Sequence, residues 1–168
     1  MFTGTYPLLM AEYNRWMNQR LYALCAELPD EERKRDRGAF FKSIHGTLDH
    51  ILWGDRVWLA RFNAKSYATA PIGQPLYENF TELRTARAEM DREILEWAHG
   101  VTPQWLAEPL TWTSKLYGFT QTQPRWVLVT QMFNHQTHHR GQLTTLLKQI
   151  GVDPGVTDIP MLPALERA

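Results

Sequence analysis

Three of the six histidines of the chain lie within five residues, in the segment NHQTHHRGQ that runs from Asn134 to Gln142. Neutral imidazole is a common ligand of divalent metal ions, and two imidazoles four residues apart on a helix lie on neighbouring turns of one face. His135 and His139 have this spacing, with His138 beside them. These residue types at this spacing indicate a pair of metal ligands. The structural alternative is a pair of hydrogen-bonded core histidines.

The histidines fall on a predicted helix that runs from Pro124, a residue suited to a first helical turn, to Ile150. At about 100° per residue, its apolar side chains share one face with His135 and His139 at the centre, so these two rings are expected to point inward. Burial also favours the neutral, metal-binding form of imidazole. His138 falls about 80° away and is expected to be partly solvated.

A catalytic metal site usually needs a third protein ligand, and the remaining histidines are His45, His50 and His99. His45 and His50 lie on opposite flanks of the apolar face of a second predicted helix, about 100° and 120° from its centre. The periodicity therefore does not choose between them. His99 falls at the predicted end of a third helix, where an imidazole can interact with the last carbonyl groups, and a structural role is favoured.

Four stretches with apolar residues at three- and four-residue steps predict four amphipathic helices. They run from Leu9 to Leu28, from about Ala39 to Asn63, from Leu76 to about His99, and from Pro124 to Ile150.

The connections between these helices are polar or rich in proline and glycine. The run LPDEERKRDRG, after the first helix, is interpreted as a solvated connector. Pro103, Pro109 and Gly118 predict a long irregular connection between the third and fourth helices, in which LTWTSKLYGFTQ is compatible with a short hairpin. We therefore predict an all-α fold, a four-helix bundle, in a single domain over residues 1–168.

Two charged residues interrupt the apolar faces of the predicted helices. Asp55 lies near the middle of the apolar face of the second helix, and Arg87 lies within that of the third. A carboxylate is rarely buried without a partner. A structural pairing is therefore favoured over a catalytic role for Asp55, and Arg87 is the candidate partner.

The composition of the 168-residue chain excludes several classes of protein. Its 18 basic and 18 acidic residues give a formal net charge of zero, so there is no overall electrostatic reason to bind nucleic acid or anionic lipid. A single cysteine, Cys25, excludes an intrachain disulfide and a cysteine-based zinc site. The sequence contains neither a long uninterrupted apolar run nor a secretory signal pattern. We therefore expect a cytoplasmic protein without a membrane span.

Three segments of the chain resemble the DinB/YfiT-like family of metal-binding four-helix proteins, which is unrelated to the DNA polymerase with a similar name. They are YNRWMNQRLY, FFKSIHGTLDHILWGDRVWLARF and NHQTHHRGQLTTLLKQIGVDPG, and they span nearly the whole chain in the expected order. In that family a metal-binding histidine opens the second-helix motif that corresponds to HILWGDRVW, at His50. The other two ligands lie in the motif that corresponds to NHQTHHRGQ, at His135 and His139. The resemblance thus implies a three-histidine site.

The resemblance also implies a function. Three neutral nitrogen ligands suit Zn²⁺ or Ni²⁺ and leave at least one coordination position for water. Relatives use low-molecular-weight thiols in transferase or isomerase reactions, which implies a metal-dependent enzyme, such as a thiol S-transferase or a hydrolase-like relative, that acts on a small-molecule electrophile. The resemblance favours a homodimer. Asn134, Arg140 and Gln142 are candidate residues around the metal or the substrate.

Two other functions remain compatible with the sequence. The first is a non-catalytic metal-binding domain, in which the ion fastens the second helix to the fourth. The second is a helical protein-interaction domain whose interface is formed by some of the seven tryptophans.

Overall fold

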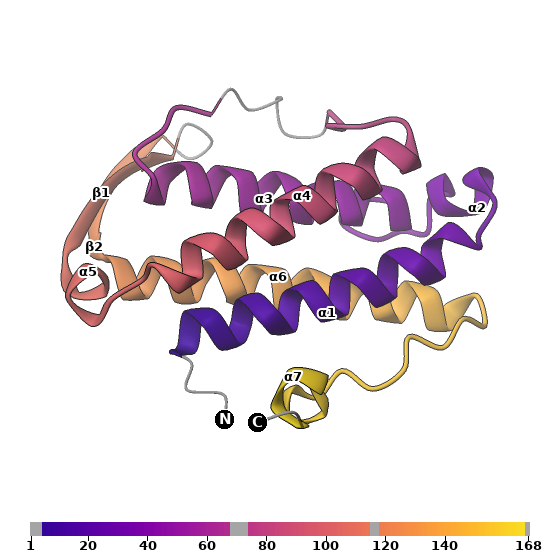
Figure 1. Ribbon diagram of the computed structural model, residues 1–168. Helices are drawn as coiled ribbons and strands as arrows, with labels where there is room; N and C mark the ends of the chain where they lie inside the picture. The colour runs from indigo at the N-terminus through magenta and orange to yellow at the C-terminus, as the bar shows by residue number, and fades with distance from the viewer. Residues whose placement is uncertain (1–4, 68–73, 115–117, 167–168) are drawn as a thin grey trace.

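The computed structural model describes residues 5–67, 74–114 and 118–166. Four long helices make up the body of the molecule (Figure 1): α1 (Tyr6–Ala26), α3 (Ile44–Phe62), α4 (Phe80–His99) and α6 (Arg125–Gln149). The shorter elements are α2 (Asp30–Lys34), α5 (Pro103–Ala107), β1 (Pro109–Ser114), β2 (Phe119–Pro124), the 3₁₀ helix Ile159–Met161 and α7 (Pro163–Glu166). The predicted helical bundle is confirmed, with a small two-stranded sheet added to it.

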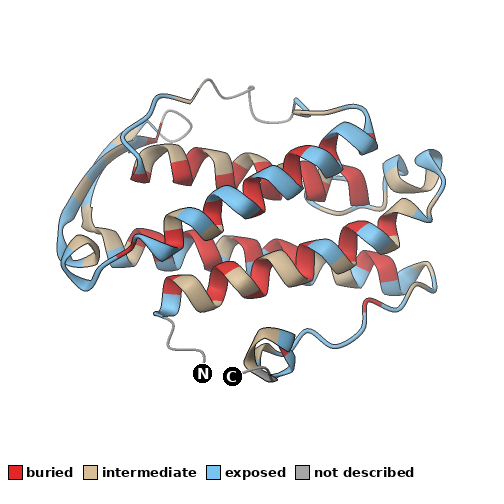
Figure 2. Cartoon of the chain, in the orientation of Figure 1, coloured by how far each residue is buried: buried red, intermediate tan, exposed pale blue. Residues whose placement is uncertain are grey.

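The helices pack in two close pairs, α1 with α4 and α3 with α6, and α3 also packs against α4. Buried residues line the faces that the long helices turn toward one another, whereas exposed residues lie on the outside (Figure 2). Met17, Leu48, Leu83, Phe133 and Leu143 are among the fully buried side chains. Each such side chain contributes about 1.5–3 kcal/mol through removal from water, so packing of these faces holds the bundle together.

The second long helix begins later than predicted, at Ile44 and not near Ala39. The preceding residues form a tight turn, in which the N–H of Lys42 donates to the carbonyl oxygen of Ala39 at 2.7 Å. Lys42 adopts a φ of 64°, which a right-handed helix excludes. The hydroxyl of Ser43 then accepts a hydrogen bond from the N–H of Gly46 and caps α3.

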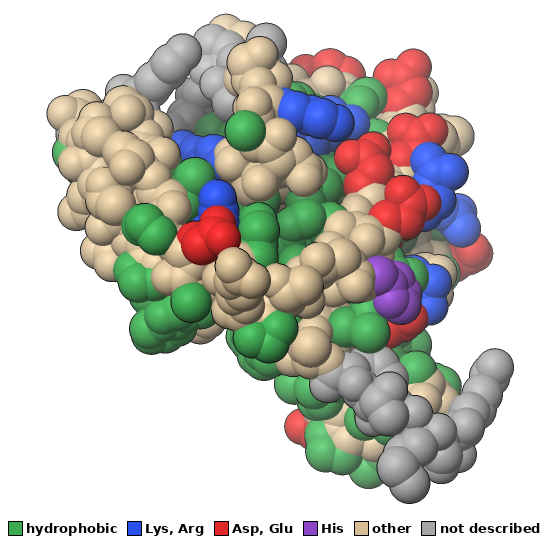
Figure 3. Space-filling view, turned by 60° about the vertical axis from the view of Figure 1, so that its left-hand side comes forward, with side chains coloured by type: hydrophobic (Ala, Val, Ile, Leu, Met, Phe, Trp, Pro, Cys, Tyr) green, Lys and Arg blue, Asp and Glu red, His purple; other side chains and the backbone are tan. Residues whose placement is uncertain are grey.

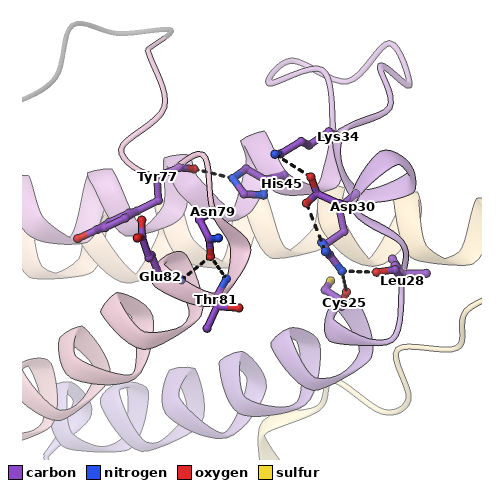
Figure 4. Close-up of polar contacts among 10 residues, drawn as sticks. Cys25, Leu28, Asp30, Lys34, His45, Tyr77, Asn79, Thr81 and Glu82 are labelled. Carbon is purple, nitrogen blue, oxygen red and sulfur yellow. Dashed lines mark hydrogen bonds and ion pairs between the residues drawn. The ribbon is translucent and has the colours of Figure 1, made fainter.

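The third long helix also begins later than predicted, at Phe80 and not at Leu76. The N–H of Leu76 donates instead to both carboxylate oxygens of Asp49, at 2.8 and 3.0 Å. The side-chain oxygen of Asn79 accepts hydrogen bonds from two N–H groups of the first turn and so caps α4 (Figure 4). The end of the helix at His99 is as predicted, and His99 is exposed there.

The charged run LPDEERKRDRG after α1 was predicted to be a solvated connector, but it also contacts the end of α1. It contains α2, from which the guanidinium of Arg33 donates to the carbonyl oxygens of Cys25 and Leu28 and also pairs with Asp30. A cation near the last carbonyl groups of a helix satisfies them and interacts favourably with the helix dipole. Arg33 therefore caps the C-terminal end of α1.

The connection before α6, predicted to be irregular, contains α5 and an antiparallel hairpin of β1 and β2. The hairpin hypothesis for LTWTSKLYGFTQ is confirmed in its described part, since residues 115–117 lie outside the described ranges. Trp112 of β1 contacts Trp58 of α3 edge-on, with 5.4 Å between ring centroids. The hairpin thereby covers one end of the bundle (Figure 1).

The predicted pairing of Asp55 with Arg87 is confirmed at the centre of the bundle. Arg87 Nη1 lies 2.6 Å from Asp55 Oδ2, and Arg87 Nη2 lies 2.9 Å from Asp91 Oδ1. The amide of Gln136, on α6, donates to the other oxygen of Asp55 at 2.6 Å. All four side chains are buried, so this network joins α3, α4 and α6 and has a structural role.

The surface of the molecule carries both charge signs, as expected from equal numbers of acidic and basic residues. Acidic and basic side chains are interspersed on the face shown in Figure 3, with hydrophobic side chains beside them. In the described part of the chain, no helix is both long and apolar enough to cross a membrane.

Candidate metal site

The packing of α3 against α6 brings His50 together with His135 and His139. One nitrogen from each imidazole can be chosen so that all three atoms lie within 4.8 Å of one another. The closest approach is 3.0 Å, between Nε2 of His50 and Nε2 of His135. His139 is buried, and the other two rings are half-buried. The structure thus gathers the three histidines that the motifs name, although 85 residues separate His50 from His135.

These nitrogen atoms fit a divalent ion in type and in spacing. Zn²⁺ binds imidazole nitrogen at about 2.0–2.1 Å in tetrahedral geometry, which places two such nitrogens about 3.3 Å apart. The 3.0 Å between His50 and His135 is close to this value.

The surroundings keep the three imidazoles in the neutral form that binds metal. Burial, with smaller contributions from the neighbouring histidines, lowers the pKa of His50 to about 3. Burial, followed by the charges of His139 and His138, lowers the pKa of His135 to about 4. Burial also lowers the pKa of His139, although its hydrogen bond to Gln142 opposes this. At neutral pH each ring therefore offers a lone pair.

Gln142 sets the proton position on His139. Its side-chain oxygen lies 2.8 Å from His139 Nδ1, and because an amide oxygen can only accept, Nδ1 carries the hydrogen and Nε2 is free to bind an ion. The amide nitrogen of Gln142 lies 3.3 Å from His138 Nε2. The solvation predicted for His138 is confirmed, since the residue is exposed, and its ring also contacts the ring of His139.

Two aromatic side chains hold the ring of His50. Phe41, from the turn before α3, stacks on it with 3.7 Å between centroids and also meets His139 edge-on. Trp53, one turn further along α3, lies nearly parallel to His50 at 5.6 Å. Sequence reasoning missed both residues. The spacing of His50 and Trp53 on one helix face was an available signal, whereas the position of Phe41 depends on the turn.

Gly54 makes room for the ring of His135. A Cβ atom at position 54 would lie 2.6 Å from Cε1 of that ring, closer than side chains approach one another. The sequence signal was a glycine in the interior of a predicted helix, which costs about 1 kcal/mol relative to alanine and usually has a packing reason. The close approach of α3 to His135 is that reason.

The other candidates from the sequence lie outside the site. His45 Nε2 is 2.7 Å from the carbonyl oxygen of Tyr77, which ties α3 to the segment before α4, so His45 has a structural contact (Figure 4). Arg140 is buried, donates to the side-chain oxygens of Asn14 and Thr137, and belongs to the core and not to a surface ion pair. Asn134 is exposed.

Replacement of Gln142 by leucine is expected to weaken Zn²⁺ binding by about 10-fold or more, the usual effect of losing a hydrogen bond to a ligating histidine. The measurement is competition against a chelating dye of known affinity. Gln149→Leu makes the same chemical change on an exposed position of the same helix and is expected to leave the affinity unchanged. Equal affinities of the two variants would show that Gln142 does not orient His139.

The chain is similar to known proteins along most of its length. A model of the DinB family matches residues 1–167. Protein DinB of Bacillus subtilis is 29% identical over 153 residues, which cover 88% of this chain and 87% of that protein. The crystal structure of a DinB-like protein from Bacillus cereus aligns with a TM-score of 0.62 at 21% identity, over 84% of this chain and 91% of that one. This last similarity supports the helical fold.

Proposed function

The chain belongs to the DinB family, and from this premise we propose that it binds a divalent metal ion through His50, His135 and His139 and uses that ion in catalysis. The observation that carries the proposal is the gathering of three neutral imidazoles from two helices within 4.8 Å. An N–H···N hydrogen bond could by itself give the 3.0 Å between Nε2 of His50 and Nε2 of His135. It does not account for the third imidazole, that of His139, in the same cluster, and this third ring supports the proposal.

The proposed ion is Zn²⁺ or Ni²⁺, which suit nitrogen ligands. When bound, such an ion supplies a Lewis acid and lowers the pKa of a coordinated water or thiol. The protein side chains fix the geometry: Phe41 and Trp53 hold His50, and Gln142 holds His139. Three protein ligands leave a position for a small molecule, and the half-buried state of His50 and His135 gives it access from solvent.

The proposed reaction is S-transfer with a low-molecular-weight thiol as cosubstrate. In such a reaction the thiol sulfur forms a bond to an electrophilic carbon, the leaving group departs with its bonding electrons, and the thiol proton passes to solvent. The family resemblance of the ligand motifs supports this choice. The second candidate is a metal-binding domain without catalysis, which is favoured by the fact that all three histidines come from α3 and α6, so that an ion would fasten these helices together.

Co²⁺ is a suitable probe because its visible spectrum reports its ligands. Addition of glutathione, bacillithiol or mycothiol to the Co²⁺-loaded protein is expected to change the spectrum as the thiol enters the open position, and one of these thiols should support turnover with a general electrophile. Both effects should be lost in His50→Ala. If Co²⁺ binds tightly but its spectrum does not change with any of the thiols, and no turnover is detected, the non-catalytic role would be established instead.

A further inference from the structure

A hollow lies on the seam between α1 and α4, and none of its lining residues belongs to α3 or α6. In Figure 1 these two helices cross in front of α3 and α6, which carry the metal site. The hollow has a volume of about 270 Å³. Arg84, Ala88 and Arg92 line it from α4 at four-residue steps, and Arg15 and Tyr22 line it from α1. The small side chain of Ala88, between two long ones, leaves the space open.

Arginine is the most frequent residue in the lining of this hollow. Four guanidinium groups and one carboxylate, that of Asp91, line it. Asp91 is already engaged by Arg87 at 2.9 Å and by Asn18 at 2.8 Å. Arg15 pairs with Glu12. Arg87 also pairs with Asp55, so two of the four guanidinium groups have acidic partners.

Arg84 and Arg92 form no ion pair with the described residues. The helix neighbours of Arg84 at three and four residues are Phe80, Thr81, Arg87 and Ala88, of which none is acidic, whereas Arg92 has Glu89 and Glu96 at these steps. A guanidinium presents several N–H donors in a planar fork that matches the oxygen atoms of a carboxylate or a phosphate. Arg84 is therefore the lining cation most readily available to a ligand.

Two buried donors that belong to the lining also lack an acceptor in the described ranges. They are the hydroxyl of Tyr22 and the Nε–H of Arg87, whose residues are 3% and 2% exposed. Burial raises the pKa of Tyr22, so its hydroxyl keeps its proton at neutral pH. A buried donor without an acceptor costs free energy, and native proteins usually satisfy it with water or a ligand. The lining thus combines exposed cations with buried donors that lack an acceptor.

We propose that the hollow between α1 and α4 is a binding site for a phosphate group, either inorganic phosphate or the phosphate of a small metabolite. A phosphate carries up to two negative charges and several acceptor oxygens, which matches the exposed guanidinium groups and the number of donors. In this proposal Arg84 and Arg92 supply exposed guanidinium groups, and Tyr22 and Arg87 supply the buried donors. The site is independent of the three histidines and of the proposed reaction.

The test is calorimetric titration of the full chain with inorganic phosphate at low ionic strength, with chloride as the control anion. Wild-type protein is expected to bind phosphate saturably, and Arg84→Gln to weaken this binding by about 10-fold or more. Arg35→Gln removes the same charge from an exposed position outside the hollow and is expected to change little. Absence of saturable binding, or equal weakening in both variants, would overturn the proposal.

A bound metal ion would itself attract phosphate, so the titration is repeated with His135→Ala protein. Unchanged affinity for phosphate in that background is expected, since His135 lies on α6 and not on the seam. Loss of phosphate binding there would assign the anion to the metal site and contradict the inference. A phosphorylated small molecule that competes with inorganic phosphate would identify the source of the group.

Discussion

The His135→Ala variant is expected to lose more than 100-fold in affinity for Zn²⁺ or Ni²⁺. Loss of a residue that merely orients a ligand already costs about 10–100-fold, and His135 supplies one of the three nitrogen atoms that lie within 4.8 Å of one another. The same loss is expected for His50→Ala and His139→Ala. Metal content after dialysis, measured by mass spectrometry, and competition with a chelator give the result.

His138→Ala is the matched control for this series, because it removes an imidazole from the same segment. His138 is exposed, and although it contacts Gln142 and the ring of His139, it contributes no nitrogen to the cluster, so a loss of less than about 10-fold is expected. Circular dichroism should show the same helix content in all four variants. Equal metal loss in His138→Ala and His139→Ala would refute the assignment of ligands.

The Arg87→Met variant is expected to lose about 3–5 kcal/mol of unfolding free energy, the usual cost of breaking a buried ion pair from one side. The substitution removes the guanidinium that lies 2.6 Å from Asp55 and 2.9 Å from Asp91, and both carboxylates are buried. Urea denaturation with linear extrapolation measures the change. Arg84→Met, three residues earlier on an exposed position of α4, is expected to cost less than about 0.5 kcal/mol.

This destabilisation should also depend on pH. Burial raises the pKa of Asp55 and of Asp91, and the charge of Arg87 lowers it, so removal of Arg87 raises both pKa values further above those of the unfolded chain. A carboxyl whose pKa is raised by folding stabilises the fold below its unfolded pKa and loses that contribution as the pH rises through the folded value. The unfolding free energy of Arg87→Met should therefore be closer to that of wild type at pH 5 than at pH 7. If the difference in unfolding free energy between the two proteins does not change with pH, these carboxylates are not what destabilises the variant.

The long helices could be predicted because the spacing of apolar residues along the chain indicates a helix directly. The positions at which the helices end could not be predicted in this way. Phe40 and Phe41 extend the apolar pattern of α3 toward its N-terminal side, yet the left-handed backbone of Lys42 and the cap at Ser43 exclude these residues from the helix. Leu76 likewise continues the pattern of α4, although its N–H is taken by Asp49. In both cases a contact with another segment decides where the helix begins.

The candidate site was predictable to the extent that it lies on one helix. The inward direction of His139 and the outward direction of His138 follow from 100° steps along α6, and burial of His139 agrees with them. The choice between His45 and His50 did not follow, because it depends on which neighbour each flank of α3 meets. His50 meets α6, whereas His45 meets the carbonyl of Tyr77. That information is tertiary, and only the family motif supplied it.

The space under His135 has a consequence for the comparison of related sequences. Position 54 contributes no ligand, but a methyl group there would meet the ring of His135 at 2.6 Å. A relative that keeps all three histidines and carries a larger residue at this position would match the ligand motifs and still hold that ring at another angle. A search for metal-binding family members that used the three histidines alone would wrongly include such proteins. A search that also required glycine at position 54 would separate sequences that retain the site from those that retain only its ligands.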